Sequence, residues 1–392
     1  MAVRKVVQVI EKYFFPVTAG IEVNMHETYK VLAREGWDVT FHTSKDTLTE
    51  KNILPDSEVI SGMSVRRYLY GKFGYFPTLD WDRSDLICLH NFNVFPHFWV
   101  LAYTLFRKLI GKKYYRLVLT PHGGFTPEWS VFPVFARFVK YIYHFTIGTL
   151  LINLVVDGVR AVSEWERDQI ISKGVDRKKV VVIENGLEDE AFEDLEDKAS
   201  ESIKEKVNSL GRYILQIGRV YPIKNYETVI KSLPNIPADI KYVIAGPVEL
   251  NSHAGYMEKL KVLIKELGLQ DRVVFIGVIK GVDKYYLIKN AVLMVHMAVW
   301  ESFCNVVHEG MSQGLVCIVA NNTALPYLIK DGINGYLINT FDYKSLAAKI
   351  NQVLEGMSSE NIKAIRENAF KFGRNNTWSD VAHRMGDFYL KA

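Results

Sequence analysis

Short apolar runs alternate with longer amphipathic stretches along this chain of 392 residues. Short runs rich in Val, Ile and Leu are typical of buried strands, and apolar residues three and four positions apart are typical of helices. The predicted strands are residues 5–10, 37–43, 85–89, 116–120, 158–162 and 180–184, then 212–218, 241–246, 272–277, 292–296, 316–320 and 335–338. Because strands alternate with helices, we predict an α/β fold built from doubly wound sheets.

An acidic and polar passage at residues 188–208 interrupts this pattern, and such passages often connect domains. We therefore predict two Rossmann-like domains, residues 1–205 and 206–375. Residues 376–392 form a predicted C-terminal helix that packs back towards the first domain. Open α/β sheets bind ligands at the carboxyl ends of their strands, so we expect these edges to face each other across a cleft.

Composition narrows the function classes. The formal net charge of +4 is too small to indicate nucleic-acid binding by itself. Cys88, Cys304 and Cys317 have no metal-ligand spacing, which favours a reducing compartment. The first residues lead directly into a strand pattern without the apolar core of a signal peptide. We therefore expect a cytoplasmic protein that binds neither nucleic acid nor a metal.

One region departs from this ordinary composition. Residues 141–156 are the longest apolar run, although polar residues interrupt it and it is short for a membrane span. Aromatic residues alternate there with Arg137 and Lys140, and further basic residues lie at 108–116. We favour a helix packed on its own sheet, and the alternative is peripheral association with the inner face of a membrane.

Two glutamates follow the predicted strand 292–296. If a helix begins near Cys304, Glu301 lies in the preceding loop and Glu309 lies about one turn inside the helix, so they cannot easily share an ion. Carboxylates suit the paired hydroxyls of a sugar, and free amides at a helix start suit phosphate. A sugar nucleotide offers all of these groups. Because a lone pair of glutamates is usually solvated, this interpretation depends on the other segments.

Other predicted strand ends carry suitable groups. Arg219 and Lys224 lie in the loop after strand 212–218, where two cations can neutralise a diphosphate and stabilise charge on a departing phosphate. Gly20 follows the first strand and would let the backbone approach a phosphate. His122 ends strand 116–120 and could contact a sugar, although a loop-packed histidine is the common alternative.

Known nucleotide-binding motifs are missing from the sequence. It contains neither a P-loop nor a Gly-x-Gly-x-x-Gly after the first strand, and no Cys/His cluster. We therefore expect Arg219, Lys224 and helix amides to neutralise the diphosphate, with no metal and no cofactor.

The segments Gly218-Arg219 to Lys224, Glu301 to Glu309 and 331–337 together resemble the family-4 retaining glycosyltransferases of GT-B fold, and the resemblance covers nearly the whole chain. It implies that Arg219 and Lys224 hold the donor diphosphate, Glu309 the ribose and Glu301 the donor sugar. It also implies that Gly20 approaches the diphosphate and that His122 contacts the sugar near the reacting carbon. The amides implied to contact sugar and phosphate are those near Phe303, Cys304, Asn305 and Val306.

The resemblance implies an enzyme that moves a hexose from a nucleotide diphosphate, for which we expect UDP, to a glycan or lipid-linked acceptor. Arg219, Lys224, Glu301 and His122 are its predicted catalytic residues. Two alternatives remain, namely a sugar-nucleotide epimerase of the same architecture and a non-enzymatic two-lobed sugar-binding protein. The chain also departs from the family pattern, with Ala19, His296-Met297, Cys304 and Tyr327 at positions where the family usually has other residues.

Overall fold

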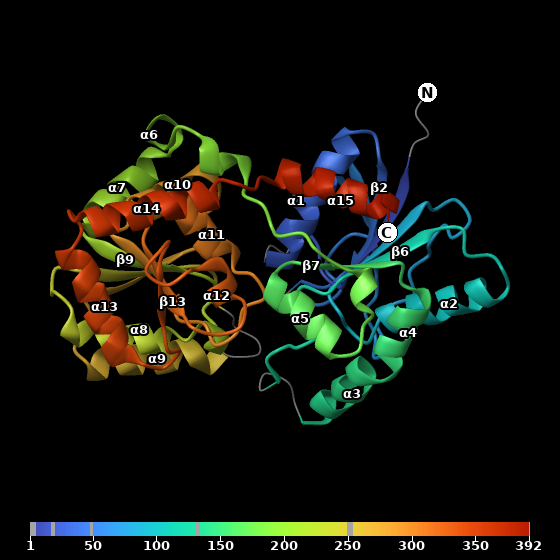
Figure 1. Cartoon of the computed structure of the whole chain (residues 1–392), viewed down its shortest axis with the longest axis horizontal. Coiled ribbons are helices and arrows are strands. Elements are labelled where there is room, and N and C mark those ends of the chain that lie inside the picture. The colour runs from blue at the N-terminus through green and yellow to red at the C-terminus, as the bar shows by residue number, and fades with distance from the viewer. Residues whose placement is uncertain (1–4, 17–19, 48–49, 130–133, 249–253, 392) are drawn as a thin grey trace. The chain divides into compact units, whose positions relative to one another are not determined.

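The computed structural model describes residues 5–16, 20–47, 50–129, 134–248 and 254–391 in two compact units. The first unit comprises Met1–Gly186 and Trp378–Ala392, and the second comprises Leu187–Thr377 (Figure 1). The second unit thus begins earlier than the boundary predicted at residue 205. The acidic passage contains helices α6 (Leu195–Lys198) and α7 (Glu201–Leu210), which contact α10 (Gly281–Lys289) of the second unit.

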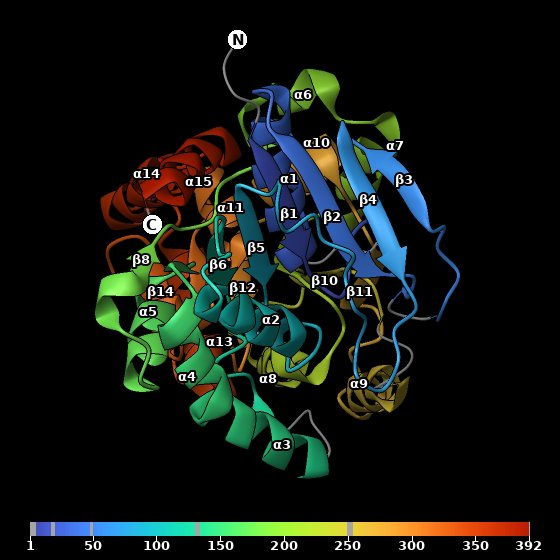
Figure 2. The ribbon, with the colours of Figure 1, turned by 90° about the vertical axis from the view of Figure 1, so that its right-hand side faces the viewer.

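The first unit is built on a sheet with the strand order β3-β4-β2-β1-β5-β6-β7-β8, parallel except for the pair β3 and β4 (Figure 2). The strands are β1 (Val6–Ile10), β2 (Asp38–Ser44), β3 (Ser57–Ile60), β4 (Met63–Tyr68), β5 (Leu86–His90), β6 (Arg116–Thr120), β7 (Gly158–Ala161) and β8 (Val180–Val182). The helices are α1 (Gly20–Arg34), α2 (His97–Leu109), α3 (Val134–Phe145), α4 (Ile147–Val155), α5 (Glu164–Ser172), the 3-10 turn η2 (Arg177–Lys179) and α15 (Trp378–Lys391).

The sequence prediction missed the hairpin of β3 and β4. Buried Met63 and Val65 alternate with exposed Ser64 and Arg66 on β4, and β3 has no buried residue. β3 lies at the sheet edge and β4 is exposed on one face, so neither sequence has the continuous apolar run that marks a strand buried on both faces.

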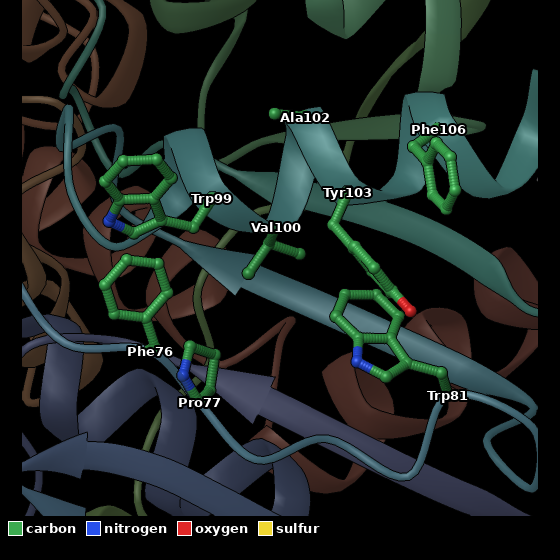
Figure 3. A pocket seen from close by; sticks show the side chains of 8 residues that line it. All are labelled: Phe76, Pro77, Trp81, Trp99, Val100, Ala102, Tyr103 and Phe106. Atoms are coloured by element: carbon green, nitrogen blue, oxygen red, sulfur yellow. The ribbon is translucent and has the colours of Figure 1, made fainter.

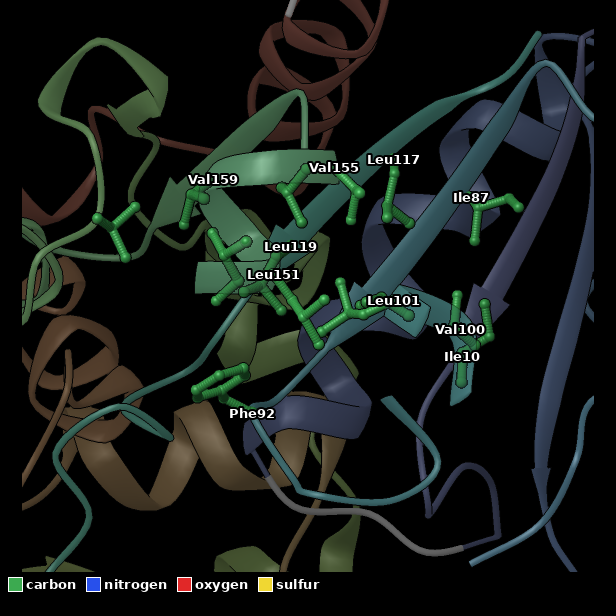
Figure 4. Packing of buried hydrophobic residues seen from close by; sticks show 14 of the residues in the cluster. Ile10, Ile87, Phe92, Val100, Leu101, Leu117, Leu119, Leu151, Val155 and Val159 are labelled. Carbon is green, nitrogen blue, oxygen red and sulfur yellow. The ribbon is translucent and has the colours of Figure 1, made fainter. Parts of the chain in front are cut away.

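Helices cover both faces of this sheet. Val7 and Val9 of β1 belong to the core cluster that also includes side chains of α1 and α15. Ile10 belongs to the cluster on the other face, where side chains of α2 and α4 such as Leu101 and Leu151 meet the sheet (Figure 4). Successive strand side chains point to opposite faces, so a strand buried on both faces is apolar nearly throughout.

The C-terminal helix α15 contacts α1 of the first unit. Trp378, Val381, Met385 and Tyr389 of α15 are buried in the core cluster they share with α1. The Tyr389 hydroxyl lies 2.7 Å from the hydroxyl of Tyr29 on α1. The last residues of the chain therefore complete the core of the first unit.

The second unit has a parallel sheet with the order β11-β10-β9-β12-β13-β14. Its strands are β9 (Tyr213–Ile217), β10 (Lys241–Ala245), β11 (Val273–Gly277), β12 (Leu293–His296), β13 (Cys317–Ala320) and β14 (Tyr336–Ile338). Its other helices are η3 (Asp189–Phe192), η4 (Pro222–Lys224), α8 (Tyr226–Ser232), η5 (Leu233–Asn235), α9 (Ala254–Glu266), α11 (Asn305–Ser312), α12 (Leu325–Leu328), α13 (Tyr343–Glu355) and α14 (Glu360–Gly373). Successive strands are added towards β11 after β9 and towards β14 after β12, so the strand order reverses between β9 and β12. Open α/β sheets bind ligands at such switch points.

The apolar run near residue 150 forms two helices, α3 and α4, separated at Thr146. Leu151, Ile152 and Val155 of α4 are buried in the core, as expected for a helix packed on its own sheet. In α3 the expectation holds only for the last turn, where Tyr143 and His144 are buried, whereas Phe135 and Phe138 are 78% and 63% exposed.

Candidate functional site

The loop after β9 is held over the carboxyl edge of the second sheet. Gln216 of β9 donates a hydrogen bond from Nε2 to the carbonyl oxygen of Lys224, at 2.9 Å, and accepts one at Oε1 from the hydroxyl of Tyr242, at 2.6 Å. The Tyr226 hydroxyl donates to the carbonyl oxygen of Arg219, at 3.2 Å. Arg219 and Lys224 lie 5 positions apart in this loop. These hydrogen bonds therefore hold both residues at the carboxyl end of β9.

Hydrogen bonds also connect this loop to the loop after β12. Asn225 has a positive φ of 51°, a conformation that asparagine tolerates better than most residues. Its Nδ2 donates to the carbonyl oxygens of Met297 and Thr340, both at 2.9 Å. The amide of Val299 donates to the carbonyl oxygen of Ile223, at 2.8 Å. The loops that carry Lys224 and Glu301 therefore form one connected unit.

Glu301 lies at the centre of this connection and is 9% exposed. Its Oε1 lies 2.5 Å from the ammonium nitrogen of Lys224 and 2.7 Å from Nε2 of His296, the last residue of β12. Burial by itself would raise the pKa of Glu301, but the charge of Lys224 and the hydrogen bond from His296 lower it to about 2. Glu301 is therefore an ionised acceptor whose orientation is set by two partners.

This arrangement predicts an unusual titration of Glu301. In protein labelled with ¹³C at the glutamate carboxyls, we expect the Glu301 signal to keep the shift of an ionised group at about pH 3.5, where ordinary glutamates are mostly protonated. In the Lys224→Met variant its pKa should rise, because burial remains after the positive charge is lost. The Glu301→Gln variant identifies the signal. A midpoint near the ordinary value in the parent protein would contradict the prediction.

Helix α11 begins directly after Cys304, whose φ is 84°. The side chains of Phe303 and Cys304 are buried, and the Phe303 ring meets the ring of His308 edge-on with centroids 5.6 Å apart. These two residues therefore offer a ligand backbone groups rather than side chains. The amide of His308 donates to the carbonyl oxygen of Cys304, four residues earlier. The amides of Asn305 and Val306 precede it in the first turn of α11, and the first turn of a helix is suited to an anion.

Glu309 occupies a second buried charge cluster. Its Oε1 lies 3.2 Å from the ammonium of Lys284 on α10, which lies 2.6 Å from Oε2 of Glu188. Its Oε2 has no hydrogen-bond partner among the described residues. Burial raises the pKa of Glu309 and Lys284 opposes this. A ligand with paired hydroxyls would satisfy the unpartnered oxygen. The sequence analysis missed Lys284 and Glu188, because nothing local marks them as neighbours of Glu309.

The remaining predicted residues, Gly20 and His122, belong to the first unit. Gly20 is the exposed first residue of α1, and residues 17–19 lie outside the described residues. His122 has a φ of 50°, and its Nε2 lies 2.9 Å from Nδ1 of His90. Nε2 of His90 lies 2.8 Å from the hydroxyl of Tyr29. Burial lowers the pKa of His122 well below its usual range, so the ring is neutral at physiological pH.

Among the described residues, one group combines ligand types that metals accept. Side-chain atoms of His296, Glu301 and Cys304 lie within 4.8 Å of one another. Glu301 is already paired with the ammonium of Lys224, whose charge opposes a cation at this position. The arrangement therefore suits an anionic ligand beside Lys224 better than a metal ion.

Comparisons with known proteins show the family of the chain. Residues 18–191 match the family model "Glycosyltransferase Family 4", and residues 197–372 match the model "Glycosyl transferases group 1". An uncharacterized 41.2 kDa protein in the cps region of Klebsiella pneumoniae is 28% identical over 81% of this chain and 86% of its own length. The D-inositol 3-phosphate glycosyltransferase of Mycolicibacterium smegmatis is 24% identical over 59% of this chain and 52% of its own length.

Solved structures share the fold. Anabaena HepE in complex with UDP and glucose has a TM-score of 0.75 and 19% identity, over 99% of this chain and 100% of its own. Sucrose-phosphate synthase from Thermosynechococcus elongatus has a TM-score of 0.77 and 18% identity, over 99% of both chains. These likenesses confirm the predicted GT-B fold.

Proposed function

Because this chain belongs to the family-4 retaining glycosyltransferases, we propose that it transfers a hexose from a UDP-linked donor to a glycan or lipid-linked acceptor. The observation that carries the proposal is the contact of Lys224 with Glu301 where β9 and β12 end. A cation for the diphosphate thereby lies beside an ionised acceptor for sugar hydroxyls, at the switch point of the sheet. The Anabaena HepE structure determined with UDP-glucose supports a donor of this class.

We assign the donor contacts as follows. Arg219 and Lys224 neutralise the diphosphate, and Glu301 accepts hydrogen bonds from the sugar hydroxyls. Glu309 accepts hydrogen bonds from the ribose, and the backbone at Phe303, Cys304, Asn305 and Val306 contacts sugar and phosphate. From the first unit, Gly20 approaches the diphosphate and His122, a neutral ring, contacts the sugar near its anomeric carbon.

The reaction exchanges one bond at the anomeric carbon. The bond to the diphosphate oxygen breaks, the bond to the acceptor oxygen forms on the same face of the sugar, and the proton of the acceptor hydroxyl passes to the departing diphosphate. As the donor bond breaks, negative charge grows on the departing diphosphate. The fixed cations of Lys224 and Arg219 stabilise that charge most in the transition state, which is the requirement for catalysis. In this proposal they supply the positive charge that a metal supplies in other enzymes.

The donor class is tested by thermal shift with UDP, GDP, ADP and NAD, each with a chelator present. We expect UDP to raise the melting temperature, because a ligand that binds only the folded state stabilises it by mass action. In the Glu309→Gln variant we expect the affinity for UDP to fall about 10- to 100-fold, because a charged acceptor of two hydrogen bonds is lost.

The matched control is Glu355→Gln, a substitution of the same kind at an exposed position of α13. It should bind UDP like the parent protein. The absence of a shift with every nucleotide, or equal UDP affinity in both variants, would contradict the donor assignment.

Family membership favours the transferase over the two alternatives, the epimerase and the two-lobed sugar-binding protein. A sugar nucleotide converted to its epimer without an acceptor would reverse that choice. We further propose that the enzyme works in the cytoplasm in glycan biosynthesis.

A further inference from the structure

Helix α3 is amphipathic, but its polar side faces the protein and its apolar side faces solvent. Arg137 and Lys140 are partly covered, and His144 is fully buried, with Nε2 bonded to the carbonyl oxygen of Phe92 at 3.0 Å. The opposite side is apolar and exposed, including Phe135 at 78% and Phe138 at 63%. A helix facing water normally buries its apolar side, so this orientation indicates that something apolar covers α3.

Exposed apolar side chains also lie on α4, which contacts α3, and on α2. Leu150 of α4 is 59% exposed and Leu109 of α2 is 77% exposed. The two helices contact each other, and the ammonium of Lys108 on α2 donates to the carbonyl oxygen of Leu154 on α4, at 2.6 Å. We call the exposed apolar side chains of α2, α3 and α4, among them Leu109, Phe135, Phe138 and Leu150, the α2–α4 surface.

A cavity of about 450 Å³ opens beside α2, lined by residues of that helix and of the segment 76–81 (Figure 3). Trp81 and Trp99 supply large aromatic faces to it, and Tyr103 and Phe106 line it while remaining 42% and 53% exposed. Aromatic side chains of this kind are enriched where proteins meet the interfacial region of a bilayer.

Positive charge is concentrated in the same part of the chain. Residues 97–156 contain seven Lys or Arg residues and one Glu, whereas the rest of the chain has two more acidic than basic residues. Lys108 and Lys112 are exposed at the end of α2. Lys178 is exposed in the turn η2, which is held at the end of α4 by Lys179, whose ammonium lies 2.6 Å from the carbonyl oxygen of Asn153.

We propose that the α2–α4 surface docks on an anionic lipid bilayer, with α3 lying in the interfacial layer. Its apolar side chains enter the boundary of the acyl chains, and the nearby cations meet lipid phosphates. This inference goes beyond the proposed function and does not depend on the donor or the acceptor. It would place the first unit next to acceptors that reside in the same membrane.

The packing of α4 favours a peripheral helix pair over a membrane span. Residues 134–155 are long and apolar enough to cross a bilayer. However, the helix is interrupted at Thr146, between α3 and α4. Leu151, Ile152 and Val155 of α4 are also part of the core. Crossing the bilayer would require α4 to leave that core.

The test is sedimentation of the full chain with vesicles of phosphatidylcholine, with and without phosphatidylglycerol. We expect binding only to the anionic vesicles and release at high salt, because exposed charges are screened. The variants Phe135→Ser/Phe138→Ser and Lys112→Glu/Lys178→Glu should each weaken binding by about tenfold or more, through lost apolar insertion and lost charge respectively.

Two control variants match these changes elsewhere. Val59→Ser/Val262→Ser removes apolar side chains that are 72% and 55% exposed, and Lys231→Glu/Lys259→Glu reverses two exposed charges of the second unit. Both should bind vesicles like the parent, and all variants should keep its melting temperature and its response to UDP.

Three results would overturn the proposal. The first is that the parent does not bind anionic vesicles, or that Phe135→Ser/Phe138→Ser and Lys112→Glu/Lys178→Glu both bind them as well as the parent does. The second is binding that resists high salt and alkaline carbonate, which would indicate an inserted span. The third is a concentration-dependent dimer that Phe135→Ser/Phe138→Ser abolishes, which would assign the surface to a second copy of this chain.

Discussion

Replacing Lys224 by methionine is expected to lower the rate of hexose transfer by about 10²- to 10³-fold, the usual effect of removing one group that stabilises transition-state charge. Lys224 contacts Glu301 directly, and its loop is bonded to the end of β9. The variant removes the ammonium and retains an unbranched side chain of similar length. It should also leave the buried carboxylate of Glu301 with only His296 as a partner among the described residues, so its orientation is less tightly fixed.

The measurement is the release of UDP from the donor under saturating acceptor, in comparison with Lys231→Met. Lys231 is an exposed lysine of α8, so its loss should leave the rate unchanged. Lys224→Arg should recover only part of the activity, because the guanidinium is larger and its charge is spread over a planar group. A folded Lys224→Met variant that releases UDP as fast as the parent would refute the assigned role of this residue.

Replacing Gly246 by alanine is expected to destabilise the second unit by about 3 kcal/mol or to prevent its folding, through overpacking and a strained backbone. Gly246 follows β10 with a φ of 144°, which L residues rarely adopt. An added Cβ would lie 2.1 Å from the carbonyl oxygen of Gly218 in the neighbouring loop. That loop leads to Arg219, so the change should also disturb the proposed diphosphate contacts if the variant folds.

Urea unfolding measures the predicted loss of stability, with Gly255→Ala as the control. Gly255 lies in helix α9, and an added Cβ there meets no atom within 4 Å. Because alanine forms helices better than glycine by about 1 kcal/mol, the control should be as stable as the parent or slightly more so. Equal unfolding free energies for Gly246→Ala and the parent would show that the strand ends do not require this close approach.

Much of the architecture could be predicted because its signals are local. Apolar runs and their polar boundaries locate six strands in each half of the chain, and these correspond to all but β3 and β4. The residues that follow strand ends could be found in the same way, because parallel strands present their carboxyl ends at one edge. Arg219, Lys224 and Glu301 were therefore named correctly as neighbours of that edge in the second sheet.

The sequence by itself determined the fold class, the strands buried on both faces and the segments that lie at the carboxyl edge of the second sheet, because each of these depends on residues close together in the chain. Only the tertiary structure decided which side chains meet. His296 and Lys224 share Glu301, and Glu188 and Lys284 lie beside Glu309, although Lys224 and Glu301 are 77 positions apart. It also decided that α3 turns its apolar side outward. Periodicity shows that a helix has an apolar side, but the direction of that side depends on the elements packed around it.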